Sequence, residues 1–337
     1  MSNLDRTPGL STCGGLADVA ARPVHEFFAG REVLVGETTK VRRLLPNLGR
    51  RLVGPWCFVD HYGPEDVATS PGMQVPPHPH CGLQTVSWLL DGEVHHRDSI
   101  GSDQLIRPGE LGLMTSGRGI AHAEMSPVPH PAQLHGVQLW VALPGESRAV
   151  EPAWEHHHEL PALTDTGVTA TVIMGELGGA RSPGRTYAPM VGADVALAPG
   201  SDGLLPLTPE FEYALLAMAG SVEVENATLA IGSMLYLGCG RRDLRLRADA
   251  SARVLLLGGA PFEERIVMWW NFVARSNEEI ATAREQWQGA TRFGEVPDAG
   301  ARLAAPELPA GRLKPGGSAV RRAARPLGVP FGVPFGR

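Results

Sequence analysis

Two short motifs in the sequence carry residue types that bind transition metals. One residue separates His78 from His80, and His122 and Glu124 have the same spacing further along the chain. In a β-strand, side chains at positions i and i+2 lie on one face, so each motif can direct both of its side chains into the same cavity. Pro79 also restrains His78 to an extended backbone. We therefore predict one metal site formed by His78, His80, His122 and Glu124.

This donor set suits a single transition-metal ion. Neutral imidazoles with one carboxylate bind Fe(II), Mn(II), Ni(II) or Cu(II), and Zn(II) accepts the same ligand types. A six-coordinate iron with four protein ligands would keep two positions for substrate or dioxygen. Thiolate ligands are not expected, because the four cysteines are scattered without a CxxC pair.

A third histidine run, from His156 to Glu159, contains the same kinds of triplet. His156 and His158 would point to one face of a strand, whereas His157 and Glu159 would point to the other. The four side chains cannot converge, so we expect this run to be a solvated connector rather than a metal site.

Short segments rich in Val, Thr, Ile and Leu, separated by many of the 41 glycines and 29 prolines, predict the strands that would position the site. Short strands at near-regular spacing are typical of sandwiches and barrels, and predict an all-β fold. The pattern fades between Pro144 and Pro161, where we expect a domain boundary. The clearest predicted strands are Glu32 to Val35, Gln84 to Leu90, Leu111 to Thr115, Val137 to Leu143, Val168 to Met174, Ala214 to Ala219 and Arg253 to Leu257.

One helix is predicted near the C-terminus, over residues 276–288. Ser276 is its expected N-cap, with Glu279 completing a capping box. From residue 295 onward the chain is rich in Pro, Gly, Ala and Arg. Such a composition predicts a disordered tail over residues 295–337, and a peptide that docks onto the body or onto a partner is the alternative.

Composition excludes several classes of protein. The length of 337 residues favours two domains, and 43% hydrophobic residues is ordinary for a soluble globule. The sequence has no apolar stretch that would span a bilayer and opens without a signal peptide, so we expect a cytoplasmic protein without membrane contact. The net charge of −6 combines a basic C-terminal stretch with a more acidic body. Direct binding to nucleic acid is therefore not expected.

Longer motifs around these residues resemble the pirins, a branch of the bicupin superfamily. The two segments that carry the resemblance most clearly are GPWCFVDHYGP, from Gly54 to Pro64, and HPHCGLQTVSWLLDGEVHHRDSIGSDQLIRPGELGLMTSGRGIAHAEMSP, from His78 to Pro127. HGVQLWVALP, from His135, and WNFVARSNEEIATA, from Trp270, are similar to further pirin segments.

The resemblance implies two tandem, jelly-roll-like cupin β-barrels. Residues 25–150 would form the metal-binding N-terminal domain after a segment of residues 1–24, and residues 151–294 the C-terminal domain with its helix. By motif position, the family's ligands fall on the same four residues, His78, His80, His122 and Glu124, and its metal is Fe(II). No histidine follows His158, so the second barrel is expected to have a structural or covering role.

Two functions follow from the resemblance. The first is a quercetin 2,3-dioxygenase that acts on a flavonol or a similar small aromatic, with Glu124 as the catalytic residue that receives the hydroxyl proton. The second is an iron-dependent redox regulator that binds a protein partner. Both need the same iron ligands, whereas a third interpretation, a structural bicupin, needs no metal.

Several further residues have open roles at this stage. Cys81-Gly82-Leu83-Gln84 replaces the Arg-Gly-Phe-Glu of many pirins, so the charged role of that segment is not expected here. His95 to Asp98 form either a surface pairing or a support for a ligand imidazole. Four other sets have both a structural and a functional interpretation: Asp60-His61, Arg118, Cys81, and the tryptophans Trp88, Trp140, Trp269 and Trp270.

Overall fold

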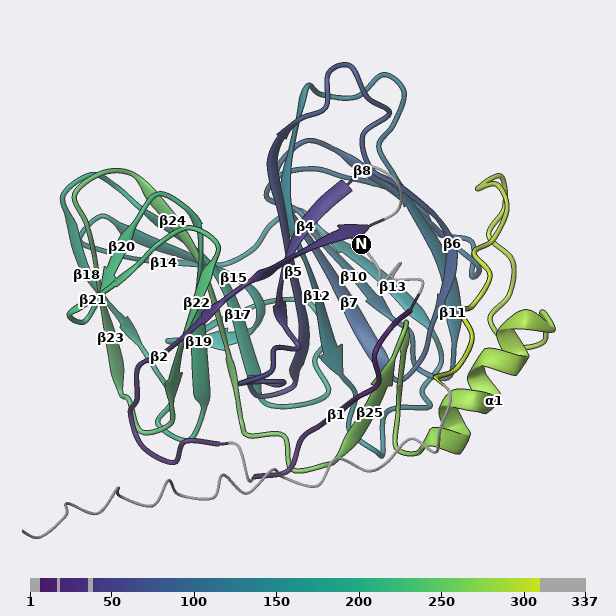
Figure 1. Ribbon diagram of the computed structural model, residues 1–337. Helices are drawn as coiled ribbons and strands as arrows, with labels where there is room; N and C mark the ends of the chain where they lie inside the picture. The colour runs from purple at the N-terminus through teal and green to yellow at the C-terminus, as the bar shows by residue number, and fades with distance from the viewer. Residues whose placement is uncertain (1–6, 17–18, 36–38, 310–337) are drawn as a thin grey trace, which may run out of the picture.

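The computed structural model describes residues 7–16, 19–35 and 39–309, and it contains two β-barrels that lie side by side (Figure 1). Strands dominate the structure, and a single α-helix lies near the end of its described part. The predicted all-β fold of two tandem cupin barrels is confirmed. Each strand predicted from the sequence falls within an observed strand or overlaps most of one.

The first barrel consists of a seven-stranded and a four-stranded antiparallel sheet. The larger sheet has the order β13 (Ala153–His157), β10 (Leu111–Thr115), β7 (Leu83–Asp91), β12 (Gln133–Ala142), β5 (Trp56–Asp66), β4 (Thr39–Leu45) and β3 (Arg31–Val35). The smaller sheet has the order β6 (Gln74–His80), β11 (Ile120–Met125), β8 (Val94–Asp98) and β9 (Asp103–Ile106).

The second barrel has the same two-sheet plan. Its larger sheet has the order β14 (Ala162–Asp165), β15 (Val168–Leu177), β17 (Met190–Leu197), β24 (Ala252–Gly259), β19 (Glu212–Ala219), β22 (Ser233–Gly238) and β2 (Glu26–Ala29), with β16 (Ala180–Arg181) beside β15. The smaller sheet has the order β18 (Ser201–Pro206), β23 (Asp243–Ala248), β20 (Val222–Val224) and β21 (Ala227–Leu229). Buried Val, Leu and Ala side chains with Tyr213 fill the space between these strands.

The two large sheets pack against each other through a shared hydrophobic core. Strand β7 is buried on both faces, and its polar residues Gln84, Thr85 and Ser87 are buried together with its apolar ones. Val86 and Trp88 of β7 belong to the same core cluster as Leu255 and Leu257 of β24. The Trp88 indole donates a hydrogen bond to Asp194 of β17 at 2.8 Å. The two barrels therefore share a packed core, and one face of the first barrel is covered by the second.

Two strands pair across the domain limits expected from the sequence, residues 25–150 and 151–294. The limits themselves stay a prediction. Strand β2 precedes the first barrel in sequence but pairs with β22 of the second. Strand β13 lies beyond residue 150 but pairs with β10 of the first. The chain thus crosses between the barrels at both ends of the N-terminal domain.

A C-terminal hairpin also returns to the first barrel. Its strands β25 (Ile266–Trp269) and β26 (Phe272–Ala274) pair with each other, and β25 pairs with β1 (Ser11–Cys13). Helix α1 (Asn277–Gln288) follows and lies beside β6 and β11 (Figure 1). Its apolar face packs in a cluster with Cys81 and Ala121 of the first barrel. The C-terminal segment therefore closes the end of the barrel that carries the predicted ligands.

The helix begins as predicted, with Ser276 as the N-cap. The Ser276 hydroxyl accepts the amide hydrogen of Glu279 at 3.2 Å. The Glu279 carboxylate does not complete the expected box, because it accepts the amide hydrogen of Arg275 and pairs with Arg148 of the first barrel. The acidic residue thus ties the helix to the barrel.

The disordered tail predicted over residues 295–337 is wrong for residues 295–309, and the rest of it lies outside the described residues. Ala299 and Ala305 are buried. The Trp287 indole donates to the Leu303 carbonyl at 2.7 Å, and the Leu303 amide donates to the Pro77 carbonyl at 2.8 Å. Small side chains and paired backbone groups allow this segment to pack, although its composition is typical of disorder.

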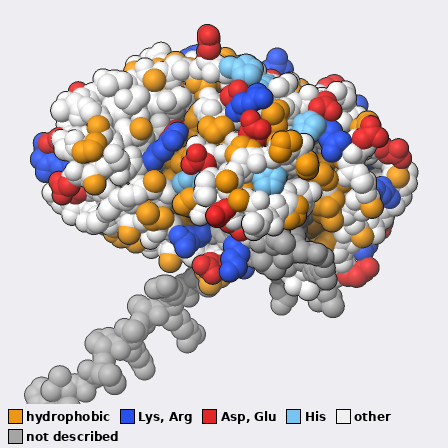
Figure 2. All heavy atoms as spheres, turned by 90° about the horizontal axis from the view of Figure 1, so that it is seen from above, with side chains coloured by type: hydrophobic (Ala, Val, Ile, Leu, Met, Phe, Trp, Pro, Cys, Tyr) orange, Lys and Arg blue, Asp and Glu red, His pale blue; other side chains and the backbone are white. Residues whose placement is uncertain are grey.

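Figure 2 shows one face of the molecule with its charged side chains coloured by sign. Basic and acidic side chains are interspersed there, and no continuous basic stripe crosses that face. Within the described ranges, no helix is both long and apolar enough to cross a membrane.

The docked segment yields a stability prediction. Trp287 is 2% exposed and packs against Phe293 and the Leu303 backbone. We expect Trp287→Ala to lower the free energy of unfolding by about 3–5 kcal/mol, since it leaves a cavity and an unpaired carbonyl. Chemical denaturation measures the change, and limited proteolysis should then cleave within residues 295–309.

The control is Leu48→Ala, because Leu48 is 98% exposed. It should change the free energy of unfolding by no more than about 0.5 kcal/mol. Similar effects of the two substitutions would contradict the packed arrangement of the C-terminal segment.

Candidate metal centre

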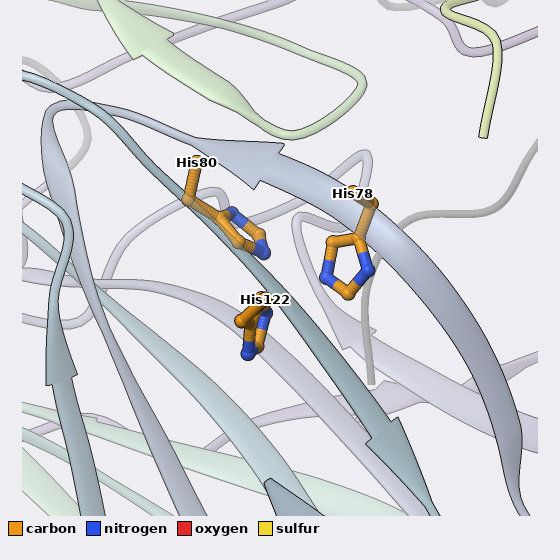
Figure 3. A group of neighbouring side chains, drawn as sticks. All are labelled: His78, His80 and His122. Atoms are coloured by element: carbon orange, nitrogen blue, oxygen red, sulfur yellow. The ribbon is translucent and has the colours of Figure 1, made fainter. Parts of the chain in front are cut away.

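Strands β6 and β11 bring the two predicted histidine motifs together. They are antiparallel neighbours in which His122 faces His78, and Ile120 faces His80. The side chains of His78, His80 and His122 are completely buried. One ring nitrogen of each lies within 4.8 Å of the corresponding nitrogens of the other two. Figure 3 shows the three rings directed toward a common point between the strands. The three imidazoles thus lie together as the spacing requires, and their role as metal ligands stays a prediction.

Backbone carbonyl groups fix the orientation of two of these rings. His78 Nδ1 lies 2.8 Å from the Pro76 carbonyl oxygen, and His80 Nδ1 lies 3.1 Å from that of Asn271. A carbonyl oxygen only accepts hydrogen bonds, so each Nδ1 must carry the hydrogen. In the neutral ring, Nε2 then keeps its lone pair and is the atom that can bind a metal.

The third ring is oriented by a chain of side chains. His122 Nδ1 lies 3.3 Å from His96 Nδ1, and His96 Nε2 lies 3.1 Å from Asp98 Oδ2. Because the Asp98 carboxylate accepts from His96 Nε2, the neutral His96 ring can accept at Nδ1 from His122. Trp154 stacks on His96 with ring centroids 3.7 Å apart and holds it in place. Of the two alternatives for His95 to Asp98, these contacts favour the support of a ligand imidazole for His96 and Asp98, which stays a prediction.

The His122 Nε2 atom is the clearest sign that the centre fits a metal. It is buried and has no hydrogen-bond partner among the described residues. An unpaired polar atom in the interior is costly, and a metal ion would satisfy its lone pair. A buried set of three Nε2 atoms, each on a ring oriented through Nδ1, fits a transition-metal ion.

Burial also keeps these imidazoles neutral. Desolvation lowers the pKa of His78 from 6.5 to about 4. Desolvation, followed by the neighbouring His78, places the pKa values of His80 and His122 well below the ordinary range. All three rings are thus uncharged near neutral pH, so protons do not compete with a metal for Nε2.

Glu124 lies on the same strand as His122 but is not one of the three converging donors. The register of β11 against β6 shifts between the two residues, which marks a bulge. The carboxylate is buried, with Oε1 3.1 Å from the Ser87 hydroxyl oxygen. Ser87 in turn lies 2.9 Å from Gln138 Oε1. The role of Glu124 as a fourth ligand therefore stays a prediction.

A cavity of about 500 Å³ is lined in part by aromatic residues; none of the three converging histidines lines it, and its link to the centre is Trp140. Phe58 and Trp140 form part of its wall and stack with ring centroids 4.0 Å apart. Trp140 also contacts one of the converging histidines, because its ring lies edge-on to the His80 ring with centroids 5.1 Å apart. Trp269 and Trp270 also line the cavity. Only Trp88 among the singled-out tryptophans lies in the core between the barrels.

Other residues singled out in the sequence have structural partners. Asp60 accepts two hydrogen bonds from the buried Arg43, both at 2.8 Å. His61 pairs with His135 at 2.9 Å. Arg118 forms an exposed ion pair with Glu151, so it stabilises a turn.

Cys81 next to the ligands is also structural. It is buried, and desolvation raises the pKa of its thiol to about 11. The thiol therefore stays protonated and poorly reactive at neutral pH, and its role is to fill space in the cluster under the C-terminal helix.

The predicted solvated connector at His156 to Glu159 is wrong in part. His156 and His157 belong to the edge strand β13, and His156 is half-buried. His156 and His158 share a face and both contact Glu110. Glu110 comes from a distant segment that strand pairing brings alongside, so the run itself carries no sign of this contact.

The comparisons with known proteins agree with this architecture. Residues 38–141 match the family model described as Pirin, and residues 192–294 match the model described as Pirin C-terminal cupin domain. A Pseudomonas aeruginosa protein named "Putative quercetin 2,3-dioxygenase" is 46% identical over 314 residues, which cover 92% of this chain and 98% of that protein. Human pirin is 32% identical over 75% of this chain and 88% of its own length.

A solved structure shows the same fold. The crystal structure of quercetin 2,3-dioxygenase from Acinetobacter baumannii superimposes with a TM-score of 0.83 and 41% sequence identity. The match covers 87% of this chain and 98% of the other.

The neutral state of the buried histidines predicts a pH dependence of stability. The pKa of His78 is about 4 when folded and about 6.5 when unfolded, so the unfolded chain binds a proton first as the pH falls. Metal-free protein should therefore lose stability between pH 6.5 and pH 4. Between pH 7 and pH 4.5, the free energy of unfolding measured in urea should fall by about 2–3 kcal/mol less for His78→Gln than for wild type.

The control is Leu48→Ala, because Leu48 is 98% exposed and carries no ionisable group. This variant should follow the wild-type pH profile. A His78→Gln profile identical to wild type would contradict the neutral, buried state of the ring.

The hydrogen-bonded chain to His122 predicts an effect on metal affinity. Asp98→Asn removes the negative charge that His96 faces but keeps one oxygen for the Ile100 and Ser102 amides. We expect the affinity of the centre for a divalent metal to fall about 10–100-fold, measured by competition with a chelator. Asp103→Asn, which alters the partner of the neighbouring His95, should leave the affinity unchanged. Equal affinities for both variants would contradict the proposed support.

Proposed function

The chain belongs to the pirin family, and from this premise we propose that it is a mononuclear iron dioxygenase of the quercetin 2,3-dioxygenase type. The substrate would be a flavonol or a similar small aromatic. The observation that carries the proposal is the position of the aromatic cavity, whose wall residue Trp140 contacts the ring of His80. The names of the similar Pseudomonas and Acinetobacter proteins support the same reaction type.

We assign the iron to His78, His80, His122 and, as the fourth ligand, Glu124. Bound iron would supply Lewis acidity and the chemistry of dioxygen. Complete burial of the three imidazoles keeps bulk water from their Nε2 atoms. Pro76, Asn271 and His96 hold the rings in the tautomer that binds metal.

The cavity walls would orient a flat substrate. Phe58 and Trp140 are stacked on each other, with 12° between their planes, and form a rigid part of the cavity wall. A volume of about 500 Å³ falls within the range of about 300–1,000 Å³ common for small-molecule sites. Arg43 also lines the cavity, with its guanidinium 4.5 Å from the Phe58 ring centroid and paired to Asp60. Arg31 and Arg51 line the cavity as well, and no carboxylate of the described residues does, so the cavity suits an aromatic with acidic hydroxyl groups.

We propose that Glu124 accepts the proton of the substrate hydroxyl. Its Oε1 atom faces the Ser87 hydroxyl, and Gln138 lies beyond that hydroxyl. These neighbours hold the carboxylate in place within the barrel. A carboxylate near the metal can take up the hydroxyl proton as the substrate binds and hold it during ring cleavage.

We also assign the protein to the cytoplasm. Its four cysteines are all buried and unbonded to one another. This state fits a reducing compartment.

Consumption of quercetin tests the proposed activity. Iron-loaded protein under oxygen should remove the visible absorbance of quercetin, and His122→Ala should abolish the reaction because it removes one of the converging ligands. Glu124→Gln should lower kcat by about 10²–10⁴-fold, as expected for loss of a general base. The rates are followed by absorbance together with the iron content of each variant.

Arg118→Ala is the matched control, since Arg118 pairs with Glu151 at the surface. It should keep wild-type activity. Iron-loaded wild-type protein that leaves quercetin and related flavonols unchanged would contradict the enzyme, and it would favour the redox regulator with a protein partner.

A further inference from the structure

A second group of metal-binding side chains lies at the edge of the first barrel, outside the centre described above. Glu110 precedes strand β10, and His156 and His158 lie on and just after strand β13. One donor atom of each lies within 4.8 Å of the donors of the other two. We propose that Glu110, His156 and His158 form a second metal site for a divalent transition metal such as Zn²⁺.

Strand pairing explains why the three side chains meet. Gly112 of β10 is opposite His156 of β13, and Leu111 is opposite His157. Glu110 is thus the next residue along the pairing and lies beside His158. His156 and His158 are at i and i+2 on the same side of the strand, with ring centroids 4.3 Å apart.

The donor atoms already point at one another. His156 Nε2 lies 2.9 Å from Glu110 Oε2, and His158 Nδ1 lies 3.0 Å from Glu110 Oε1. A metal ion would replace the hydrogens that these contacts share. The Arg107 amide also donates to Glu110 Oε2 at 2.9 Å, which holds the carboxylate in place with or without a metal.

The exposure of the three residues suits an ion that enters from solvent. The side chains of Glu110 and His156 are 14% and 8% exposed, whereas that of His158 is 61% exposed. Two donors are therefore held by the protein, and the third closes the site from outside. Two imidazoles and a carboxylate with water in the fourth position form a common tetrahedral zinc environment.

Such an ion would also brace the support of the first centre. It would link the turn before β10 to β13, and Trp154 of β13 stacks on His96. His96 in turn orients the ligand His122. The second site is nevertheless independent of the proposed dioxygenase, since it uses none of its ligands.

Zinc titration of the full chain tests the proposal. The His122→Ala background removes one ligand of the first centre, so that zinc binding there is weakened. Chelator-stripped protein in this background should bind one zinc ion with a rise in melting temperature. Adding His158→Ala should weaken that binding by at least about a hundredfold, more than loss of an outer hydrogen-bonding partner costs, and should remove the rise. Because His158 is largely exposed, its substitution should not disturb folding.

His157→Ala is the matched control in the same background. His157 is the neighbouring residue on the opposite face, and it contacts Glu155 instead of Glu110. Its removal should leave zinc affinity and melting temperature unchanged. Failure of the His122→Ala protein to bind zinc, or equal losses from His157→Ala and His158→Ala, would overturn the second site. Neither result would depend on whether the protein consumes quercetin.

Discussion

Transfer of three imidazoles from water into the first barrel is the constraint on which the rest of the structure depends. In that environment a charged imidazole is strongly disfavoured. A neutral ring still needs an acceptor for its N–H group and a partner for the lone pair of its other nitrogen. Carbonyl groups take the Nδ1–H of His78 and His80, and His96 stands beside that of His122. The remaining lone pairs then converge between β6 and β11. Burial thus sets both the charge and the direction of the donors.

The second barrel helps the first to keep polar side chains in its interior. The second barrel is filled by aliphatic side chains, and its large sheet covers one face of the first. That cover allows the first barrel to keep polar groups such as Ser87, Gln138 and Glu124 inside without access to bulk water. The interior polarity of one barrel therefore depends on the apolar packing of the other.

Sequence patterns were sufficient for the fold, the helix and the meeting of three histidines. Alternation within strands and the turn residues between them depend on local chemistry, so the strand around Val86 and the N-cap at Ser276 could be read directly. Contacts between distant segments could not. The Asn271 carbonyl is a backbone group with no sequence signal, and Glu110 approaches His156 only through strand pairing. The tail was misjudged because Ala299 and Ala305 fit a surface that composition does not reveal.

The carbonyl of Asn271 makes the orientation of His80 depend on a part of the chain that is synthesised late. His78, His80 and His122 leave the ribosome early, but the group that orients His80 belongs to the turn between β25 and β26. A nascent chain that has completed only its first barrel therefore holds an unfinished centre. Maturation of the site must wait until the hairpin has emerged and folded back, so incomplete translation products would carry the histidines without the geometry that orders them.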